Sequence, residues 1–162
     1  MNDFSFKIPQ EIVFGVGALK RLPELLEKCG SRKMLIVSDR SLEKIGVVDK
    51  VKKIVEASGI EVSMFLDILP NPTVEMVDQA VKAYQDSGAT SIVALGGGSP
   101  MDVAKAVGVL ATYGGSITEY EGAHTVPGAI VPMIAIPTTA GTGSEVTAFS
   151  VITDTARNYK LT

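Results

Sequence analysis

Short apolar runs of strand length alternate with helical patterns along most of this chain. The apolar runs lie at residues 34–37, 61–66, 92–95 and 131–136, and apolar residues recur at helical spacing between them. Strands separated by helices of this length require crossover connections, which build a parallel sheet covered by helices on both faces. The alternation therefore predicts an α/β fold with its polar chemistry at the carboxyl ends of the strands.

Individual residues mark where the expected helices begin and end. Thr73 is expected to cap a helix after the break at residues 70–72, and Gly88 is expected to end it. Before the first apolar run, Pro23 is expected to divide a helical stretch or to begin its second half. Residues 4–14 mix aromatic and β-branched side chains, so we expect them to be extended. These signals mark the boundaries between the expected strands and helices. The sequence shows no internal repeat.

Composition bounds the class of protein. The chain has 162 residues, 46% of them hydrophobic, which suits a single domain over residues 1–162 with a sizeable core. The net charge of −3 is spread along the chain and offers no basic surface for nucleic acid or for an anionic membrane. The start of the chain lacks a signal-peptide pattern, and no apolar run reaches membrane-spanning length. We expect a cytoplasmic protein in which the lone Cys29 has a packing role.

The turn Gly96-Gly97-Gly98-Ser99 follows an apolar run and opens a helical pattern. Glycines at these positions would let backbone N–H groups approach an anion such as a phosphate closely. Ser99 is expected to be the N-cap of the helix, with Pro100 at its first position and Asp102 completing a variant of the capping box. The turn suits phosphate binding or, as the simpler alternative, a tight connection between a strand and a helix.

Neither of the common glycine-rich phosphate motifs matches this turn. The dinucleotide pattern G-x-G-x-x-G/A can begin at Gly96 but meets Met101 where its last glycine or alanine should stand. The nucleoside-triphosphate loop requires a lysine at its end, whereas the nearest lysine, Lys105, lies inside the expected helix. The turn alone therefore does not identify its ligand.

A second loop, which follows the run at 131–136, is rich in hydroxyl groups. Its hydroxyl-bearing residues are Thr138, Thr139, Thr142, Ser144 and Thr147. These groups could donate hydrogen bonds to phosphate or ribose oxygens, or they could satisfy the backbone of their own turn. Asp39 and Asn71 follow two other expected strands. Because the carboxyl ends of parallel strands meet at one edge of a sheet, we expect these residues to gather around a ligand.

Two motifs carry a resemblance to a known family. They are Gly96-Gly97-Gly98-Ser99-Pro100-x-Asp102-x-Ala104-Lys105 and, later in the chain, Pro137-Thr138-Thr139-Ala140-Gly141-Thr142-Gly143-Ser144-Glu145-Val146-Thr147. The chain resembles the iron-activated (group III) alcohol dehydrogenases, and the likeness extends over residues 15–154. The resemblance implies the Rossmann-like, dinucleotide-binding domain of an enzyme that oxidises an alcohol reversibly with NAD or NADP.

The resemblance also implies which residues hold the dinucleotide. Gly97, Gly98 and Ser99 would bind the pyrophosphate, with Gly96 and Asp102 beside them. Asp39 would accept hydrogen bonds from the adenosine ribose, and Asn71 would lie near the adenine. Thr138, Thr139 and Thr142 would border the adenine and phosphates. Phe149, Val151 and Lys160 would reach toward the nicotinamide half, and Ser144 and Thr147 are further cofactor-binding candidates in the second loop.

Asp39 bears on the choice of cofactor. A carboxylate that faces a 2′-phosphate is repulsive, so NAD is favoured over NADP, although the neighbouring Arg40 keeps NADP open. Without the resemblance, Asp39 could be a turn residue, and Lys160 would equally well be explained as a solvated surface charge.

The resemblance implies a second, all-helical domain in which one aspartate and three histidines bind iron or zinc. This chain contains one histidine, His124, for which we expect a surface or loop-packing role. We therefore expect a truncated or split product that lacks the helical domain, cannot bind the metal at its usual site, and is inactive alone. The apolar surface that the helical domain would cover is expected to favour a homo-oligomer such as a dimer. The small alcohol or aldehyde substrate would bind largely outside these residues.

Two other classes of function remain open from the sequence. Dehydroquinate synthases and glycerol dehydrogenases share a similar dinucleotide-binding architecture, although the hydroxyl-rich loop favours the alcohol dehydrogenases. The chain could alternatively be a non-catalytic nucleotide-binding module that keeps the cavity without the chemistry.

Overall fold

A computed structural model describes residues 11–162, so most of the extended segment expected at 4–14 lies outside the described residues. The main sheet contains β1 (Lys33–Val37), β2 (Glu61–Phe65), β3 (Ser91–Gly96) and β4 (Met133–Pro137). The strands are parallel and lie in the order β2-β1-β3-β4. The predicted α/β fold with a parallel sheet is therefore confirmed. The strand order reverses between β1 and β3, so the switch point of the sheet lies between these two strands.

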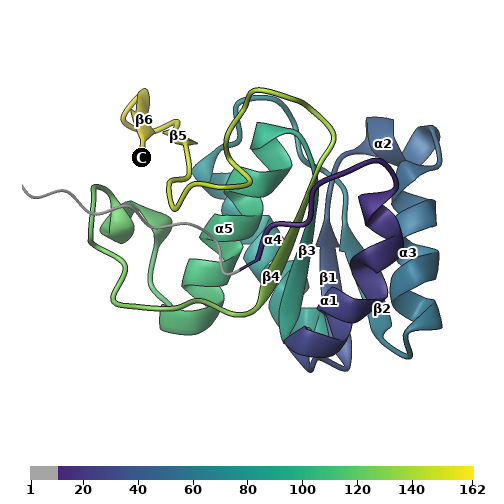
Figure 1. The fold of residues 1–162 in the computed structure, drawn as a ribbon. Coiled ribbons are helices and arrows are strands. Elements are labelled where there is room, and N and C mark those ends of the chain that lie inside the picture. Colours follow the sequence, from purple (N-terminus) through teal and green to yellow (C-terminus); the bar gives the residue numbers. More distant parts are fainter. Residues whose placement is uncertain (1–10) are drawn as a thin grey trace, which may run out of the picture.

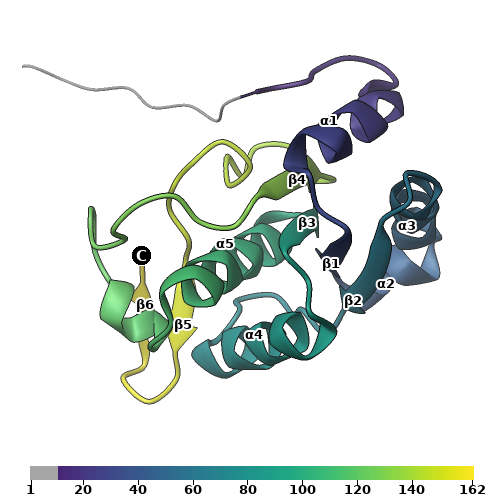
Figure 2. The same cartoon turned by 90° about the horizontal axis from the view of Figure 1, so that it is seen from below.

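Helices cover both faces of the sheet (Figures 1 and 2). α1 (Leu22–Cys29) and α3 (Val47–Ala57) lie on one face, and α4 (Val74–Ser87) and α5 (Gly98–Tyr113) lie on the other. The side chains of β1 alternate between the two faces of the sheet. Met34 and Ile36 pack toward α1 and α3, whereas Leu35 and Val37 pack toward α4 and α5. All of these side chains are fully buried, as the continuous apolar run requires.

The boundaries of α1 and α4 follow the signals in the sequence. The Thr73 hydroxyl accepts a hydrogen bond from the Met76 backbone N–H at 3.3 Å, and Gly88 ends α4 in the left-handed conformation at φ 67°. A 3-10 turn (Ala18–Arg21) precedes α1, and Pro23 lies in its first turn, as expected. Half-buried Cys29 packs against the cluster beneath α1, and burial raises the pKa of its thiol. These local predictions are confirmed.

The start of α5 differs from the prediction. Gly97, not Ser99, is the N-cap residue, and it makes no side-chain capping hydrogen bond. Ser99 lies inside the helix, and Asp102 forms no capping box because its carboxylate accepts hydrogen bonds from Ser144 and Val151 in the loop after β4. The prediction of a capping box was therefore wrong, because the Asp102 carboxylate binds residues that are distant in the sequence.

Four short elements were not expected from the sequence. α2 (Arg40–Lys44) follows β1 directly, and β5 (Ile152–Asp154) pairs antiparallel with β6 (Tyr159–Leu161) in a hairpin outside the main sheet. A 3-10 turn (Ile117–Tyr120) lies in the glycine-rich connection before β4. Within the described part of the chain, no helix is both long and apolar enough to cross a membrane.

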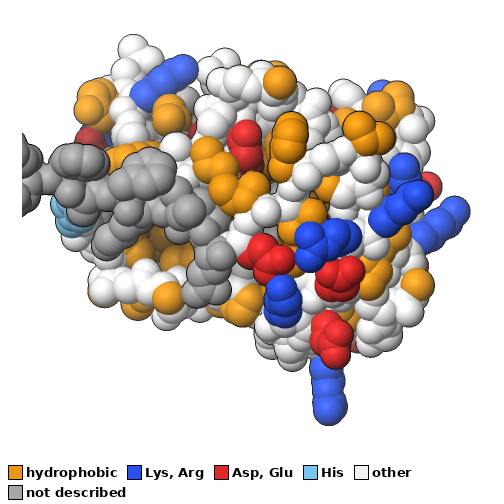
Figure 3. Space-filling model, in the orientation of Figure 1, with side chains coloured by type: hydrophobic (Ala, Val, Ile, Leu, Met, Phe, Trp, Pro, Cys, Tyr) orange, Lys and Arg blue, Asp and Glu red, His pale blue; other side chains and the backbone are white. Residues whose placement is uncertain are grey.

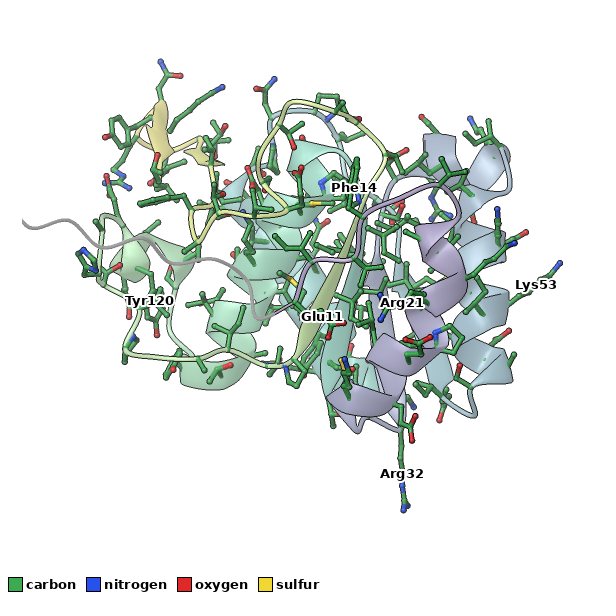
Figure 4. The ribbon with its side chains drawn as sticks, in the orientation of Figure 1. Glu11, Phe14, Arg21, Arg32, Lys53 and Tyr120 are labelled. Carbon is green, nitrogen blue, oxygen red and sulfur yellow. The ribbon has the colours of Figure 1, made fainter. Side chains whose placement is uncertain are left out.

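Charges of both signs are interspersed over α1 in Figure 3. Glu11 lies beside Arg21 in Figure 4 and forms ion pairs with Arg21 at 3.7 Å and with Lys28 at 2.5 Å. These contacts tie the first described residues to α1. They leave charge of both signs on this face of the molecule.

Candidate functional site

A cavity of about 650 Å³ lies at the carboxyl ends of the strands. Residues 39–42 after β1, 66–70 after β2, 97–100 after β3 and 138–139 after β4 form its walls. This is the crevice at the switch point where open α/β sheets bind ligands, and its volume suits a small molecule or cofactor. The expected gathering of polar strand ends is therefore present for Asp39, the glycine turn and the first residues of the hydroxyl-rich loop.

One wall of the cavity is uncharged and consists of the glycine turn and Thr139. A Cβ added at Gly97 would come within 3.0 Å of the Thr139 hydroxyl oxygen, so these segments approach each other closely. The first amides of α5, at Gly98 and Ser99, have no acceptor inside the helix, and Pro100 has no N–H. Ser99 lines the cavity and does not serve as the cap, so this wall presents backbone donors and a hydroxyl suited to an anion.

Gly96 gives the turn its shape. Its φ is 145°, and a Cβ there would lie 2.7 Å from Cγ of Pro100. Its carbonyl accepts a hydrogen bond from the Thr138 N–H at 2.9 Å, which carries the pairing of β3 and β4 to the edge of the cavity. Gly96 therefore supports the wall without being part of the lining.

The opposite wall is charged. Asp39 is the N-cap of α2, and its Oδ1 accepts hydrogen bonds from the N–H groups of Ser41 at 2.9 Å and Leu42 at 3.0 Å. These bonds match the alternative interpretation of Asp39 as a turn residue, but Asp39 also lines the cavity. Its second carboxylate oxygen takes no part in the cap, so capping and ligand binding are compatible.

Arg40 lies on the same charged wall between two carboxylates. Its Nε donates to Oδ1 of Asp67 at 3.0 Å, and its Nη1 donates to Oε2 of Glu43 at 3.0 Å. The hydrogen bonds to Glu43 and Asp67 raise the pKa of the Arg40 guanidinium. Asp67 also lines the cavity and forms an isolated backbone bridge with Asp39. The role of Asp67 was not foreseen, since only the fold brings the segments after β1 and β2 together.

The hydroxyl-rich loop divides into two parts. Thr138 and Thr139 line the cavity. The Thr142 hydroxyl instead donates to Oε2 of Glu145 at 3.1 Å and accepts from the Ser144 N–H at 3.3 Å. Ser144 donates its hydroxyl to Oδ1 of Asp102 at 2.5 Å. The two later hydroxyls thus satisfy groups of the protein itself, which was the alternative open from the sequence.

Lys105 is a charged residue whose role the sequence did not reveal. It is 8% exposed on the inward face of α5, and its ammonium donates to carbonyl oxygens of Ser144 at 3.0 Å and Phe149. Burial lowers the pKa of Lys105, and the Asp102 carboxylate, 3.3 Å away, opposes that shift. The signal was a lysine at an otherwise apolar helical position, between Ala104 and Ala106.

The remaining expected ligand contacts lie outside the lining of the cavity. Asn71, at φ 56°, accepts a hydrogen bond from the Lys160 ammonium at 3.1 Å, which joins the loop after β2 to the C-terminal hairpin. Phe149 and Val151 are exposed in the loop before β5, and Thr147 is exposed nearby. Asn71 and Lys160 thus contact each other, and none of these five residues lines the cavity.

The described residues offer no metal centre. Residues 11–162 contain no group of three or more histidine, cysteine, aspartate or glutamate side chains placed to hold a metal ion. His124 is exposed in the loop before β4, as expected for a surface residue. The donor set of this part of the chain therefore does not fit an iron or zinc site, whereas the glycine turn and its free amides fit a pyrophosphate.

Known proteins resemble the chain over nearly its whole length. It is 44% identical over 159 residues to choline dehydrogenase of Bacillus subtilis, covering 96% of this chain and 40% of that protein. It is 40% identical to NAD-dependent methanol dehydrogenase of Bacillus methanolicus, covering 97% of this chain and 41% of that protein. The chain therefore spans about two fifths of the length of these relatives.

Solved structures agree with the sequence relatives. A 1,3-propanediol oxidoreductase superposes with a TM-score of 0.95 at 36% identity, over 99% of this chain and 42% of that one. Sulfoacetaldehyde reductase of Bifidobacterium kashiwanohense, solved in complex with NAD⁺, gives a TM-score of 0.86 at 34% identity, over 99% and 43% of the two chains. The family model for iron-containing alcohol dehydrogenases matches residues 9–162. The resemblance seen in the motifs is thereby confirmed, and the chain belongs to the iron-containing alcohol dehydrogenase family.

Proposed function

We propose that the chain is the dinucleotide-binding domain, residues 1–162, of an alcohol dehydrogenase and that its cavity binds NAD. The observation that carries this proposal is the cavity at the switch point, one wall of which is a glycine turn with unpaired amides at a helix start. Membership of the iron-containing alcohol dehydrogenases and a relative named as an NAD-dependent methanol dehydrogenase support it.

The pyrophosphate would rest on the uncharged wall. The amides of Gly98 and Ser99 and the Ser99 hydroxyl would donate to its oxygens, and Thr139 would close the cradle from the other side of Gly97. Each hydrogen bond to a charged group contributes about 1.5–3 kcal/mol, whereas the helix dipole contributes about 0.3–1 kcal/mol. The positions of the amides and hydroxyls would therefore govern affinity more than the orientation of α5.

The adenosine half would lie along the charged wall. The free oxygen of Asp39 would accept hydrogen bonds from the adenosine ribose, and Asn71 would lie toward the adenine. Phe149, Val151 and Lys160 would border the nicotinamide half from the loop and the hairpin. Thr142 would border the adenine and phosphates, and Asp102 would lie beside the pyrophosphate. Ser144 and Thr147 complete the set of proposed cofactor-binding residues.

The charges on this wall favour NAD over NADP. Asp39, Glu43 and Asp67 surround the single cation Arg40, which already donates to Glu43 and Asp67. A 2′-phosphate would bring further negative charge against these carboxylates, whereas a ribose hydroxyl would not. Arg40 could serve a 2′-phosphate only by giving up its present partners.

The complete reaction would be reversible hydride transfer between a small alcohol and the nicotinamide ring. A bound divalent metal supplies a Lewis acid that stabilises the alkoxide in such a reaction. Because the described residues do not fit that metal, we propose that a polypeptide of these 162 residues binds the dinucleotide without turnover. We also propose that the chain forms a homo-oligomer, since Phe14 is 99% exposed and its neighbours Ile12 and Val16 are exposed too; sedimentation as a monomer at all concentrations would contradict this. A cytoplasmic location is a separate part of the proposal.

Titration calorimetry with NAD, NADP and ADP-ribose tests the proposal. We expect weak binding of all three ligands, with a higher affinity for NAD than for NADP. ADP-ribose should retain much of the affinity of NAD, because it keeps the pyrophosphate and both riboses. Absence of heat from every ligand would support a non-catalytic structural module instead. Metal-dependent alcohol oxidation by a mass-verified 162-residue preparation would refute the expected lack of turnover.

A further inference from the structure

Among the described residues that line the cavity, Arg40 is the one that carries positive charge. Its guanidinium has five N–H donors in a planar fork, a shape that suits phosphate. The contacts within residues 11–162 use its Nε and its Nη1, and none of them uses its Nη2. Arg40 therefore keeps donors that an anionic group of a ligand could use.

Two carboxylates surround this cation. Asp67 accepts a hydrogen bond from Nε at 3.0 Å, and Glu43 accepts one from Nη1 at 3.0 Å. One cation against two carboxylates leaves an excess of negative charge, which repels an anionic ligand even where N–H donors are free. The two carboxylates therefore mask an anion site that Arg40 would otherwise form on the charged wall.

Glu43 and Asp67 differ in their relation to the cavity. Asp67 lines the cavity, whereas Glu43 lies outside the lining. The Glu43 side chain is 36% exposed and the Asp67 side chain 61%, so solvent screens the pair of Glu43 with Arg40 less. A ligand in the cavity would thus contact Asp67 directly, but it would experience Glu43 through Arg40.

The helix α2 fixes Glu43 relative to Arg40. The two residues are three positions apart, a spacing that places their side chains on one face of the helix. The Glu43 N–H donates to the Asp39 carbonyl at 3.2 Å, and the Asp39 side chain caps the same helix. The start of α2 therefore sets Glu43 against Arg40 whether or not a ligand is bound.

We propose that Glu43 is a positioning residue for the choice of cofactor: by holding Nη1 of Arg40, it masks an anion site that would otherwise bind a phosphate on the adenosine ribose. This inference rests on the proposed binding of a dinucleotide in the cavity. It assigns part of the discrimination to a residue outside the lining, beyond the direct repulsion by Asp39 and Asp67.

The substitution Glu43→Gln tests the inference, because it removes the charge and keeps the size of the side chain. Calorimetry should show the affinities for NADP and for adenosine 2′,5′-bisphosphate rising about fourfold, the scale of an exposed ion pair. The affinities for NAD and for 5′-AMP, which lack the 2′-phosphate, should stay within twofold. Glu24→Gln is the matched control, since Glu24 pairs with Arg21 at the same spacing and at 3.0 Å but lies outside the lining, and it should change none of these values.

A second background separates release of Arg40 from a general loss of negative charge. With Arg40→Ala already present, Glu43→Gln should leave the NADP affinity unchanged, because no guanidinium remains to be released. A gain that persists without Arg40, or no gain in Glu43→Gln alone, would overturn the inference.

The bisphosphate also separates this inference from the proposed function. If the unaltered chain binds neither NAD nor 5′-AMP, the proposed function fails. Binding of the bisphosphate that appears with Glu43→Gln and disappears with Arg40→Ala would still support the masked anion site. Absence of bisphosphate binding in both variants would overturn it.

Discussion

The two walls of the cavity are built in different ways. The wall from β3 and β4 is uncharged and presents backbone amides and hydroxyls of Ser99, Thr138 and Thr139. The wall from β1 and β2 presents charged side chains, namely Asp39, Arg40 and Asp67. Backbone donors bind any pyrophosphate alike, whereas charged side chains distinguish ligands that differ in charge. The comparison suggests that one wall governs affinity and the other governs the choice of ligand.

Gly96→Ala should break the uncharged wall most severely. Alanine would be strained at φ 145°, and its Cβ would lie 2.7 Å from Cγ of Pro100, so the turn would have to shift. Strain and overpacking together should lower the free energy of unfolding by about 3 kcal/mol, measured by urea denaturation. Gly141→Ala is the control, because its φ is 91° but a Cβ there meets nothing within 4 Å. Equal losses for the two variants would show that the contact with Pro100 costs nothing.

Gly97→Ala should weaken binding while the fold survives. Its φ of −86° suits alanine, and the new methyl group would meet the hydroxyl of exposed Thr139, which can move. The methyl group would narrow the cradle, so calorimetry should show NAD and NADP affinities both falling about tenfold. The loss should be the same for both ligands, since this wall carries no charge. A change in the ratio of the two affinities would mean that the walls do not divide their roles as proposed.

Short-range rules account for the parts of the site that the sequence predicted. The apolar runs, the Thr73 cap and the glycine turn each follow from a few neighbouring residues, and they placed the cavity at the correct edge of the sheet. The start of α5 was misjudged because the same rules favour Ser99 as a cap. The partners of Asp102 lie 42 and 49 residues away, at Ser144 and Val151.

Tertiary contacts decide the parts that the sequence could not supply. Lys105 is an unusual residue on an apolar helix face, but its acceptors are carbonyl groups, which any residue possesses and no motif marks. Asp67 likewise matters because it accepts a hydrogen bond from Arg40, 27 residues earlier, and the pairing of β1 with β2 brings the two residues together. α2 is only five residues long, which is too short to show a periodic pattern. Asp39, which caps it, was interpreted mainly as a ligand-binding residue.

Asp67→Asn gives the smallest expected effect and tests the charged wall alone. Removing one negative charge lowers the repulsion of a 2′-phosphate and weakens the hold of residue 67 on the Nε donor of Arg40, so NADP affinity should rise about threefold while NAD affinity stays within twofold. The gain should shrink at high salt, because these side chains are solvent-exposed. Asp78→Asn on α4 makes the same change in net charge away from the cavity and should leave the ratio unaltered. The double variant Arg40→Ala/Asp67→Asn should lose the gain, whereas a gain that persists there would assign the discrimination to Asp67 alone.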